Sequence, residues 1–184
     1  MFKSITVIII IFFTANQTSV GQYVFSGHAG LNYSNVSSKN SINPDGILGM
    51  NAGFSYKIYL DDLGWALMPG IAFSQEGFKD QRIDYINVPL SVGFDFTSSF
   101  SLSTGFQVSQ LIGSSNEAKE VFHGSNFAFL ITFEFFPTNK FVTGLRFANG
   151  IKNIVKAPNM INIQTASTYS IQFYIGYVLH RKSK

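Results

Sequence analysis

Residues that could support catalysis or metal binding are few and widely spaced in this 184-residue chain. It has no Cys, and its three histidines are His28, His123 and His180. No two of these have the short spacing of a metal-binding pair, so we expect no metal site and no cofactor. His123 lies near Glu117 and Glu120, where a triad with a nearby serine is conceivable, but no nucleophile motif accompanies it. The sequence therefore predicts no catalytic residues and a protein that is not an enzyme.

Charged residues are the other candidates for chemistry, although only 12% of the chain is charged, against about 25% in a typical soluble domain. Four lie inside segments of otherwise apolar and small residues: Lys57, Asp95, Glu134 and Arg146. Their charges sum to zero, and buried charges must be paired. We therefore expect an internal charge network, with a conduction pathway as the alternative. Glu134 and Arg146 share one face of a predicted hairpin, which predicts a contact between them.

The segments that hold these charges alternate bulky apolar residues with small polar ones. In 127–136, Phe129, Ile131 and Phe133 fall on one face, whereas Thr132 and Glu134 fall on the other. This period of two is typical of a β-strand with one apolar and one polar face. Eight such strands are predicted, and all four charges fall on the polar faces: 22–34, 46–59, 64–76, 83–96, 100–112, 125–136, 140–149 and 166–179.

The lengths of these strands and of their connections indicate a membrane barrel. Most strands reach the length that a tilted strand needs to cross a bilayer, about 9–11 residues. Short turns alternate with longer polar loops, as in outer-membrane barrels. A cation facing lipid at mid-membrane costs about 2–4 kcal/mol, so the bulky, charge-free face should meet lipid. We predict an all-β, eight-stranded antiparallel up-and-down transmembrane β-barrel with short periplasmic turns (61–63, 97–99, 137–139) and longer extracellular loops (35–45, 77–82, 113–124, 150–165).

The start of the chain predicts export. Lys3 precedes an apolar run at 5–13, and the small residues Ser19 and Gly21 fit a signal-peptidase site before Gln22. This run is far shorter than the roughly 20 residues of a membrane-spanning helix. We assign 1–21 to a cleaved signal peptide and 22–184 to the barrel, located in the outer membrane. The net charge of +3 comes from the two ends of the chain, so no nucleic-acid surface is expected.

Two prolines lie within predicted strands, although proline lacks the donor that a ladder needs. Pairing across the 77–82 connection places Pro69 opposite residue 90, close to Pro89. We predict a local bulge that both strands share at this point.

Five short segments follow one another along the chain in a characteristic order. They are 27–32 (GHAGLN), 69–74 (PGIAFS) with Gly77, 85–90 (YINVPL), 150–154 (GIKNI) and 176–179 (GYVL). Together they resemble the PorT-like outer-membrane β-barrel family of the Bacteroidetes group. The resemblance implies an eight-stranded barrel in a family mostly of unassigned function, one branch of which is linked to protein secretion. Barrels of this kind often end on an aromatic residue read by the assembly machinery, whereas this chain continues through His180 to Lys184.

These observations predict a small integral outer-membrane protein with a structural or interaction role, which presents extracellular loops. Its expected partners are outer-membrane lipid, the barrel-assembly machinery during insertion, and an extracellular or periplasmic protein that the sequence does not identify. One alternative is an accessory component of outer-membrane transport or protein secretion, and another is a rim enzyme that acts on lipid through His123. The last is a soluble exported lipocalin-like barrel with its bulky face around an apolar ligand, which would leave an unusually uncharged surface in water.

Overall fold

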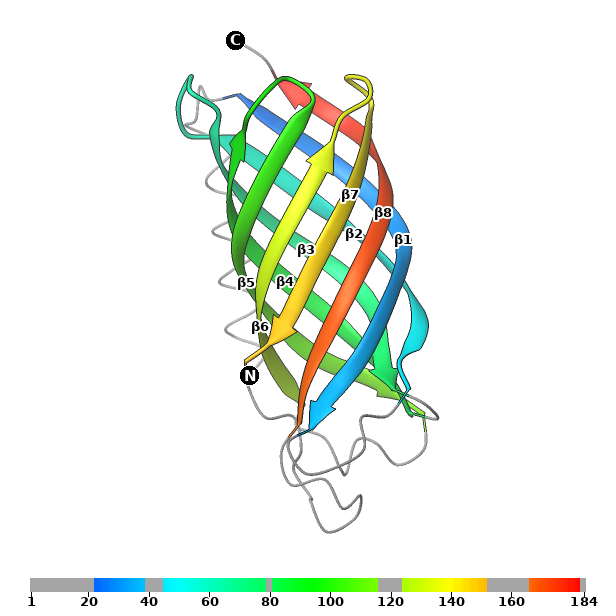
Figure 1. Cartoon of the computed structure of the whole chain (residues 1–184). Helices are drawn as coiled ribbons and strands as arrows, with labels where there is room; N and C mark the ends of the chain where they lie inside the picture. The colour runs from blue at the N-terminus through cyan, green and yellow to red at the C-terminus, as the bar shows by residue number, and fades with distance from the viewer. Residues whose placement is uncertain (1–21, 39–44, 79–80, 116–123, 152–165, 183–184) are drawn as a thin grey trace.

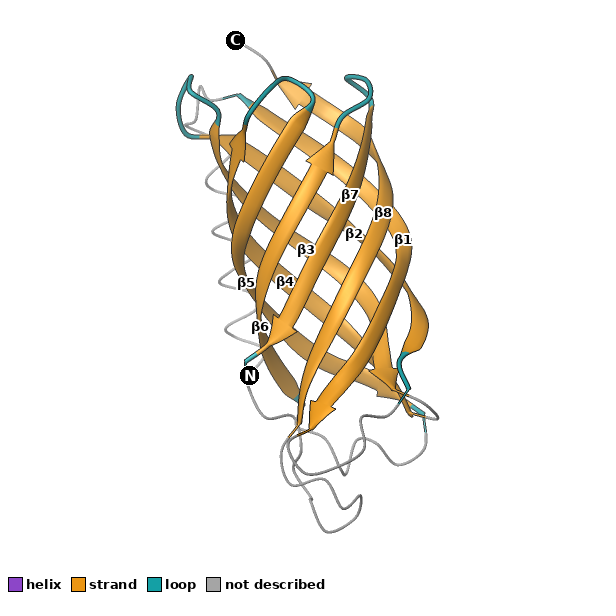
Figure 2. Cartoon of the chain, in the orientation of Figure 1, coloured by secondary structure: helices purple, strands orange, loops and turns teal. Residues whose placement is uncertain are grey.

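Eight strands close into one antiparallel barrel, in which each strand pairs with its neighbours in chain order and the last pairs with the first (Figure 1). The computed structural model describes residues 22–38, 45–78, 81–115, 124–151 and 166–182. The described segments are strands joined by turns (Figure 2), which confirms the predicted fold class. The strands are β1 (Tyr23–Ser38), β2 (Ile47–Tyr59), β3 (Trp65–Phe78), β4 (Gln81–Asp95), β5 (Phe100–Ser114), β6 (Ser125–Phe135), β7 (Phe141–Gly150) and β8 (Ala166–Lys182).

Three predicted features lie partly or wholly outside the described residues. The signal peptide assigned to 1–21 lies outside the described residues. The four longer loops lie partly outside them, at 39–44, 79–80, 116–123 and 152–165. The candidate catalytic His123 is among them. None of the described segments is a helix long and apolar enough to cross a membrane.

The barrel closes over a longer stretch than the sequence pattern predicts, because β8 extends to Lys182 instead of ending near residue 179. His180 pairs with Phe25, Arg181 with Val24 and Lys182 with Tyr23. Backbone pairing does not depend on side-chain polarity, so the basic residues continue the ladder after the apolar alternation has stopped. His180 to Lys182 therefore form the last rungs of the seam between β1 and β8.

The three tight turns are built alike, each with a side-chain oxygen that accepts two backbone N–H groups. Asp61 Oδ1 accepts from Leu63 at 3.1 Å and from Trp65 at 2.9 Å. In the other two turns the acceptors are Thr97 and Thr138, whose Oγ1 atoms accept at 3.1–3.2 Å from the second and third residues that follow. Such side-chain acceptors fix tight turns. All three turns lie at the end of the barrel that also holds the C-terminal end of β8 (Figure 1).

The two prolines interrupt the ladder without a bulge. Pro69 pairs with Leu90 as predicted, but the β3–β4 register is the same before this pair and after it, where pairing resumes at Ala72 and Asn87. The predicted shared bulge is therefore wrong, because the missing donors remove ladder bonds without the insertion of an extra residue. The register shifts lie elsewhere, between Phe25 and Ser26 on the β1–β8 seam and between Asp84 and Tyr85 on the β4–β5 seam.

Candidate functional site

The four charged residues singled out in the sequence all lie on the inner face of the barrel. Lys57, Glu134 and Arg146 are 3–8% exposed, and the Asp95 side chain is 19% exposed. Their inward position follows from the alternation of each strand, since the neighbouring bulky residues point outward. They come from β2, β4, β6 and β7, so the closure of the barrel is what brings them into one interior.

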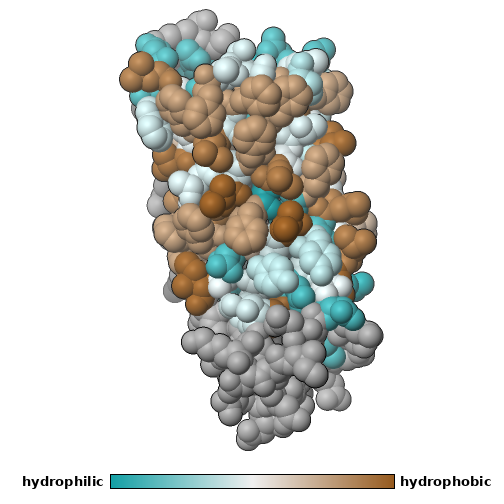
Figure 3. All heavy atoms as spheres, in the orientation of Figure 1, coloured by the Kyte–Doolittle hydropathy of each residue, from teal (hydrophilic) through white to brown (hydrophobic). Residues whose placement is uncertain are grey.

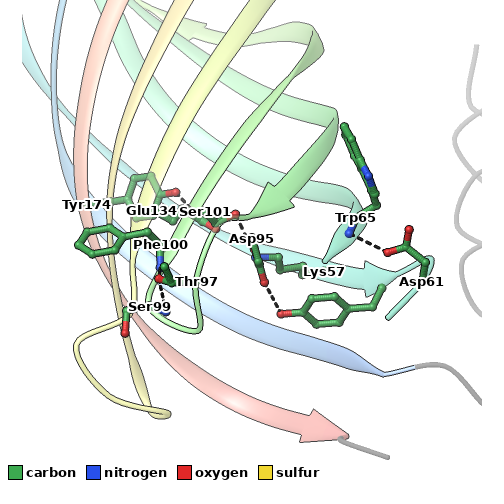
Figure 4. A network of polar contacts seen from close by, with 11 residues as sticks. Lys57, Asp61, Trp65, Asp95, Thr97, Ser99, Phe100, Ser101, Glu134 and Tyr174 are labelled. Atoms are coloured by element: carbon green, nitrogen blue, oxygen red, sulfur yellow. Dashed lines mark hydrogen bonds and ion pairs between the residues drawn. The ribbon is translucent and has the colours of Figure 1, made fainter. Parts of the chain in front are cut away.

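Lys57 and Asp95 form an ion pair inside the end of the barrel that holds the tight turns. Figure 4 shows this pair beside Ser101, whose Oγ accepts from Lys57 Nζ at 3.0 Å. The other Asp95 oxygen accepts from the Tyr59 hydroxyl at 2.8 Å. Lys57 Nζ also lies 5.6 Å from the Tyr59 ring centre and 5.1 Å from that of Phe136. The pair is thus enclosed by hydrogen-bond and cation–π partners that compensate its burial.

Glu134 and Arg146 are brought together through Tyr174 of β8. The Tyr174 hydroxyl donates to Glu134 Oε1 at 2.8 Å, and the Arg146 guanidinium lies 5.4 Å from the Tyr174 ring centre. Arg146 Nε donates to Thr132 Oγ1 at 3.2 Å. The Tyr174 ring lies over Gly144, where an added Cβ would stand 2.0 Å from Cζ. The predicted contact is therefore mediated by a tyrosine that sequence reasoning did not assign to the network.

Two more buried titratable residues, Glu76 and His28, lie in the lumen, and sequence reasoning missed the first of them. Glu76 is 4% exposed and lies on the inner face of β3 near its end; the alternation through Ser74 and Glu76 could have revealed it. His28 is 8% exposed, and its ring centre lies 4.8 Å from that of Tyr174. His28 thus packs in the lumen, on the small, polar face of β1. His180 is exposed and stacks on Tyr23 at 5.4 Å.

The middle of the lumen is filled by side chains. A cavity of about 10 Å³, lined by His28, Met68, Thr132 and Arg146 among others, has room for about one water molecule. Within the described part of the chain, no three histidine or acidic side chains gather as metal ligands would. The interior chemistry therefore consists mainly of charge pairing and hydrogen bonding in a closely packed lumen.

The outer face carries the bulky residues in a broad apolar band (Figure 3). Leu31, Phe54, Leu90, Phe106 and Phe173 are each 50–58% exposed, although they are among the most apolar residues of the chain. Soluble monomeric proteins rarely expose a contiguous apolar surface of this kind, which is typical of contact with a membrane or a partner. The structure therefore does not favour the lipocalin-like alternative, which needs the bulky face inside and the polar face outside.

Comparisons with known proteins agree with this geometry. No protein-family model matches the chain, and no curated protein is similar to it in sequence. Among solved structures, Ail, the attachment invasion locus protein of Yersinia pestis, in complex with the heparin analogue sucrose octasulfate, is 16% identical and has a TM-score of 0.51, covering 88% of this chain and 99% of Ail. Neisserial surface protein A is 11% identical with a TM-score of 0.53, covering 84% and 97% of the two chains.

At these identities the likeness shows the fold alone. The chain has the fold of the small eight-stranded outer-membrane β-barrels, with an apolar exterior and a packed polar lumen. No arrangement of nucleophile, base and acid accompanies that fold among the described residues.

Proposed function

We propose that this protein is an integral outer-membrane barrel that anchors its longer loops at the cell surface for contact with other molecules. The observation that carries the proposal is the closed ladder with bulky apolar side chains outside and ionic side chains inside. Closure satisfies the backbone hydrogen bonds that hydrocarbon cannot satisfy. The arrangement is stable in a bilayer, whereas water would penalise its exterior.

The packed interior supports an anchoring role over transport. Lys57 reaches from β2 to Ser101 of β5, and Glu134 and Arg146 are engaged with partners on β8 and β6. An eight-stranded barrel is just wide enough for its side chains to fill. We therefore assign the interaction role to the four longer loops, which contact a partner outside the barrel.

Three further assignments belong to this proposal. The first 21 residues direct export and are removed before Gln22. The barrel-assembly machinery inserts the mature chain into the outer membrane. Membership of the PorT-like family is supported by the ordered segments at 27–32, 69–74 and 85–90, which lie on β1, β3 and β4.

Fractionation of the chain expressed with residues 1–21 in a Gram-negative host tests the location. The protein should sediment with outer membranes, require detergent for extraction, and migrate differently on gels before and after heating. The same chain without residues 1–21 is the control and should stay in the cytoplasm. Recovery of the mature chain as a monodisperse species in buffer without detergent would refute the proposal.

Planar-bilayer recording separates the anchoring role from the transport alternative. The packed lumen predicts no single-channel current from the folded protein. A steady current that changes when Arg146 is replaced by Leu would instead favour a transport accessory.

A further inference from the structure

Among the described residues, Glu76 is the one buried carboxylate that belongs to neither of the two charge groups described above. Lys57 is paired with Asp95, and Arg146 is linked to Glu134 through Tyr174. Glu76 lies on β3, towards the end of the barrel that carries the longer loops, and is 4% exposed. No ion pair joins it to a Lys, Arg or His within the described ranges. An isolated buried carboxylate is costly unless a positive charge compensates it.

Strands β1, β2, β3 and β4 each contribute neutral polar side chains to a cluster that includes Glu76. Glu76 Oε1 accepts from Ser74 Oγ at 3.0 Å, and the Asn87 amide makes a second hydrogen bond to the carboxylate. Ser74 Oγ accepts in turn from Asn32 Nδ2 at 3.3 Å. In the strand register, Ser74 lies opposite Asn51 of β2 and Tyr85 of β4. We call Asn32, Asn51, Ser74, Glu76, Tyr85 and Asn87 the Glu76 cluster; each is at most 4% exposed.

This cluster concentrates polar atoms that have no protein partner. They are Asn32 Oδ1, both amide atoms of Asn51, the Tyr85 hydroxyl and Asn87 Oδ1. Buried polar groups almost always find a partner, and each exception needs an explanation such as water or an ion. Asn32 Oδ1 lies over Gly49, only 3.1 Å from where a Cβ would stand, so that any larger residue at position 49 would crowd this oxygen.

The free atoms are mainly acceptors, which favours a cation over a neutral or anionic ligand. Three amide oxygens and a carboxylate are the oxygen ligands that hard cations prefer. Water alone would satisfy the amides but would add no positive charge to balance Glu76, for which the described residues supply no ion-pair partner. A single carboxylate balances one positive charge, whereas strong calcium sites combine several carboxylates.

We propose that the Glu76 cluster is a binding site for a monovalent hard cation, sodium in the first place. The Glu76 carboxylate supplies the charge, and the side-chain oxygens of Asn32, Asn51 and Asn87 supply neutral ligands. The site lies inside the barrel, towards the longer loops, and is independent of the role proposed for the loops and of the membrane location.

A comparison of thermal unfolding in two salts tests the site. Residues 22–184 are refolded in detergent micelles in sodium chloride or in N-methyl-D-glucamine chloride of equal ionic strength, so that screening is the same. Ligand binding to the folded state should raise the midpoint by roughly 3–6 °C at a sodium concentration about ten times the Kd. The rise should saturate as sodium increases.

The variant Glu76→Gln should lose the sodium-dependent rise, whereas Glu134→Gln, a matched change of another lumenal carboxylate, should keep it. Equal midpoints of the unaltered chain in the two salts would overturn the proposal and mean that Glu76 is held protonated beside water. A rise with calcium but none with sodium would overturn the monovalent assignment. The comparison on the unaltered chain decides the question even if Glu76→Gln does not fold.

Discussion

Replacement of Lys57 by Met tests whether the lumenal charges hold the barrel together. Met keeps the length and apolar stem of the side chain but removes the ammonium group. The change takes away the ion pair with Asp95, the 3.0 Å hydrogen bond to Ser101 and two cation–π contacts. Of the partners described above, Asp95 then keeps only Tyr59, whose hydroxyl donates a hydrogen bond to it at 2.8 Å.

The expected loss in free energy of unfolding depends on how well solvent and Tyr59 stabilise the Asp95 charge without Lys57. Breaking a buried ion pair by removing one partner costs about 3–5 kcal/mol. The Asp95 side chain is 19% exposed and retains a hydroxyl donor, so we expect the lower end, about 3 kcal/mol. Asp95→Asn should cost at least as much, because it leaves Lys57, whose side chain is 4% exposed, as the uncompensated charge. The double variant should lose about 2 kcal/mol less than the sum of the single losses, as coupled neighbours do.

Denaturant unfolding of the barrel in detergent micelles measures these losses. The single tryptophan, Trp65, is 46% exposed on the outer face near a tight turn and reports unfolding by its fluorescence. Lys140→Met, at an exposed turn, is the matched control and should be neutral. A Lys57→Met variant within about 0.5 kcal/mol of the unaltered chain would show that the pair contributes nothing net. Strict additivity in the double variant would refute the coupling.

Three further variants address other parts of the barrel. Glu134→Gln should lower the free energy of unfolding by about 2–4 kcal/mol because it leaves Arg146 uncompensated; unchanged heat stability on gels would contradict the link through Tyr174. Gly144→Ala should cost about 1–3 kcal/mol in the same unfolding assay because its Cβ would stand 2.0 Å from Tyr174 Cζ, whereas Gly124→Ala, which meets only Gln110 Nε2 at 3.5 Å, should be neutral. Leu90→Arg, near the middle of β4 on the lipid-facing side, should reduce folding into vesicles by about 2–4 kcal/mol, and Ser98→Arg in a turn should not; equal folding yields would mean that Leu90 does not face lipid.

Period-two alternation was sufficient to predict the barrel and the inward direction of its charges. Each strand carries its own pattern, so that Phe133 and Glu134, for example, are assigned to opposite faces without knowledge of any partner strand. The alternation also placed all four ionic residues on the small, polar faces, which predicted that none of them faces lipid. Strand ends were less predictable, because pairing continues on backbone bonds after the pattern stops, as at Arg181 and Lys182.

The contacts within the lumen were not predictable, since they depend on register and closure. Tyr174 pairs with Gly144 on one side and Gly30 on the other, and no sequence pattern announces that its ring lies over the first. Glu76 was overlooked because it lies at the end of its predicted strand, next to a polar loop. A carboxylate there is equally compatible with solvent, and only the fold shows that it points inward.

The interior is asymmetric along the barrel axis, and this bears on where function resides. At the end with tight turns, Lys57, Asp95 and their aromatic neighbours close the lumen with paired charges. Towards the longer loops, the Glu76 cluster holds a carboxylate and several amide atoms that have no balancing charge or hydrogen-bond partner among the described residues. Paired charges resist the entry of further ions, whereas unpaired acceptors attract them. Any ligand of the barrel interior should therefore bind from the loop end, without passage to the opposite side.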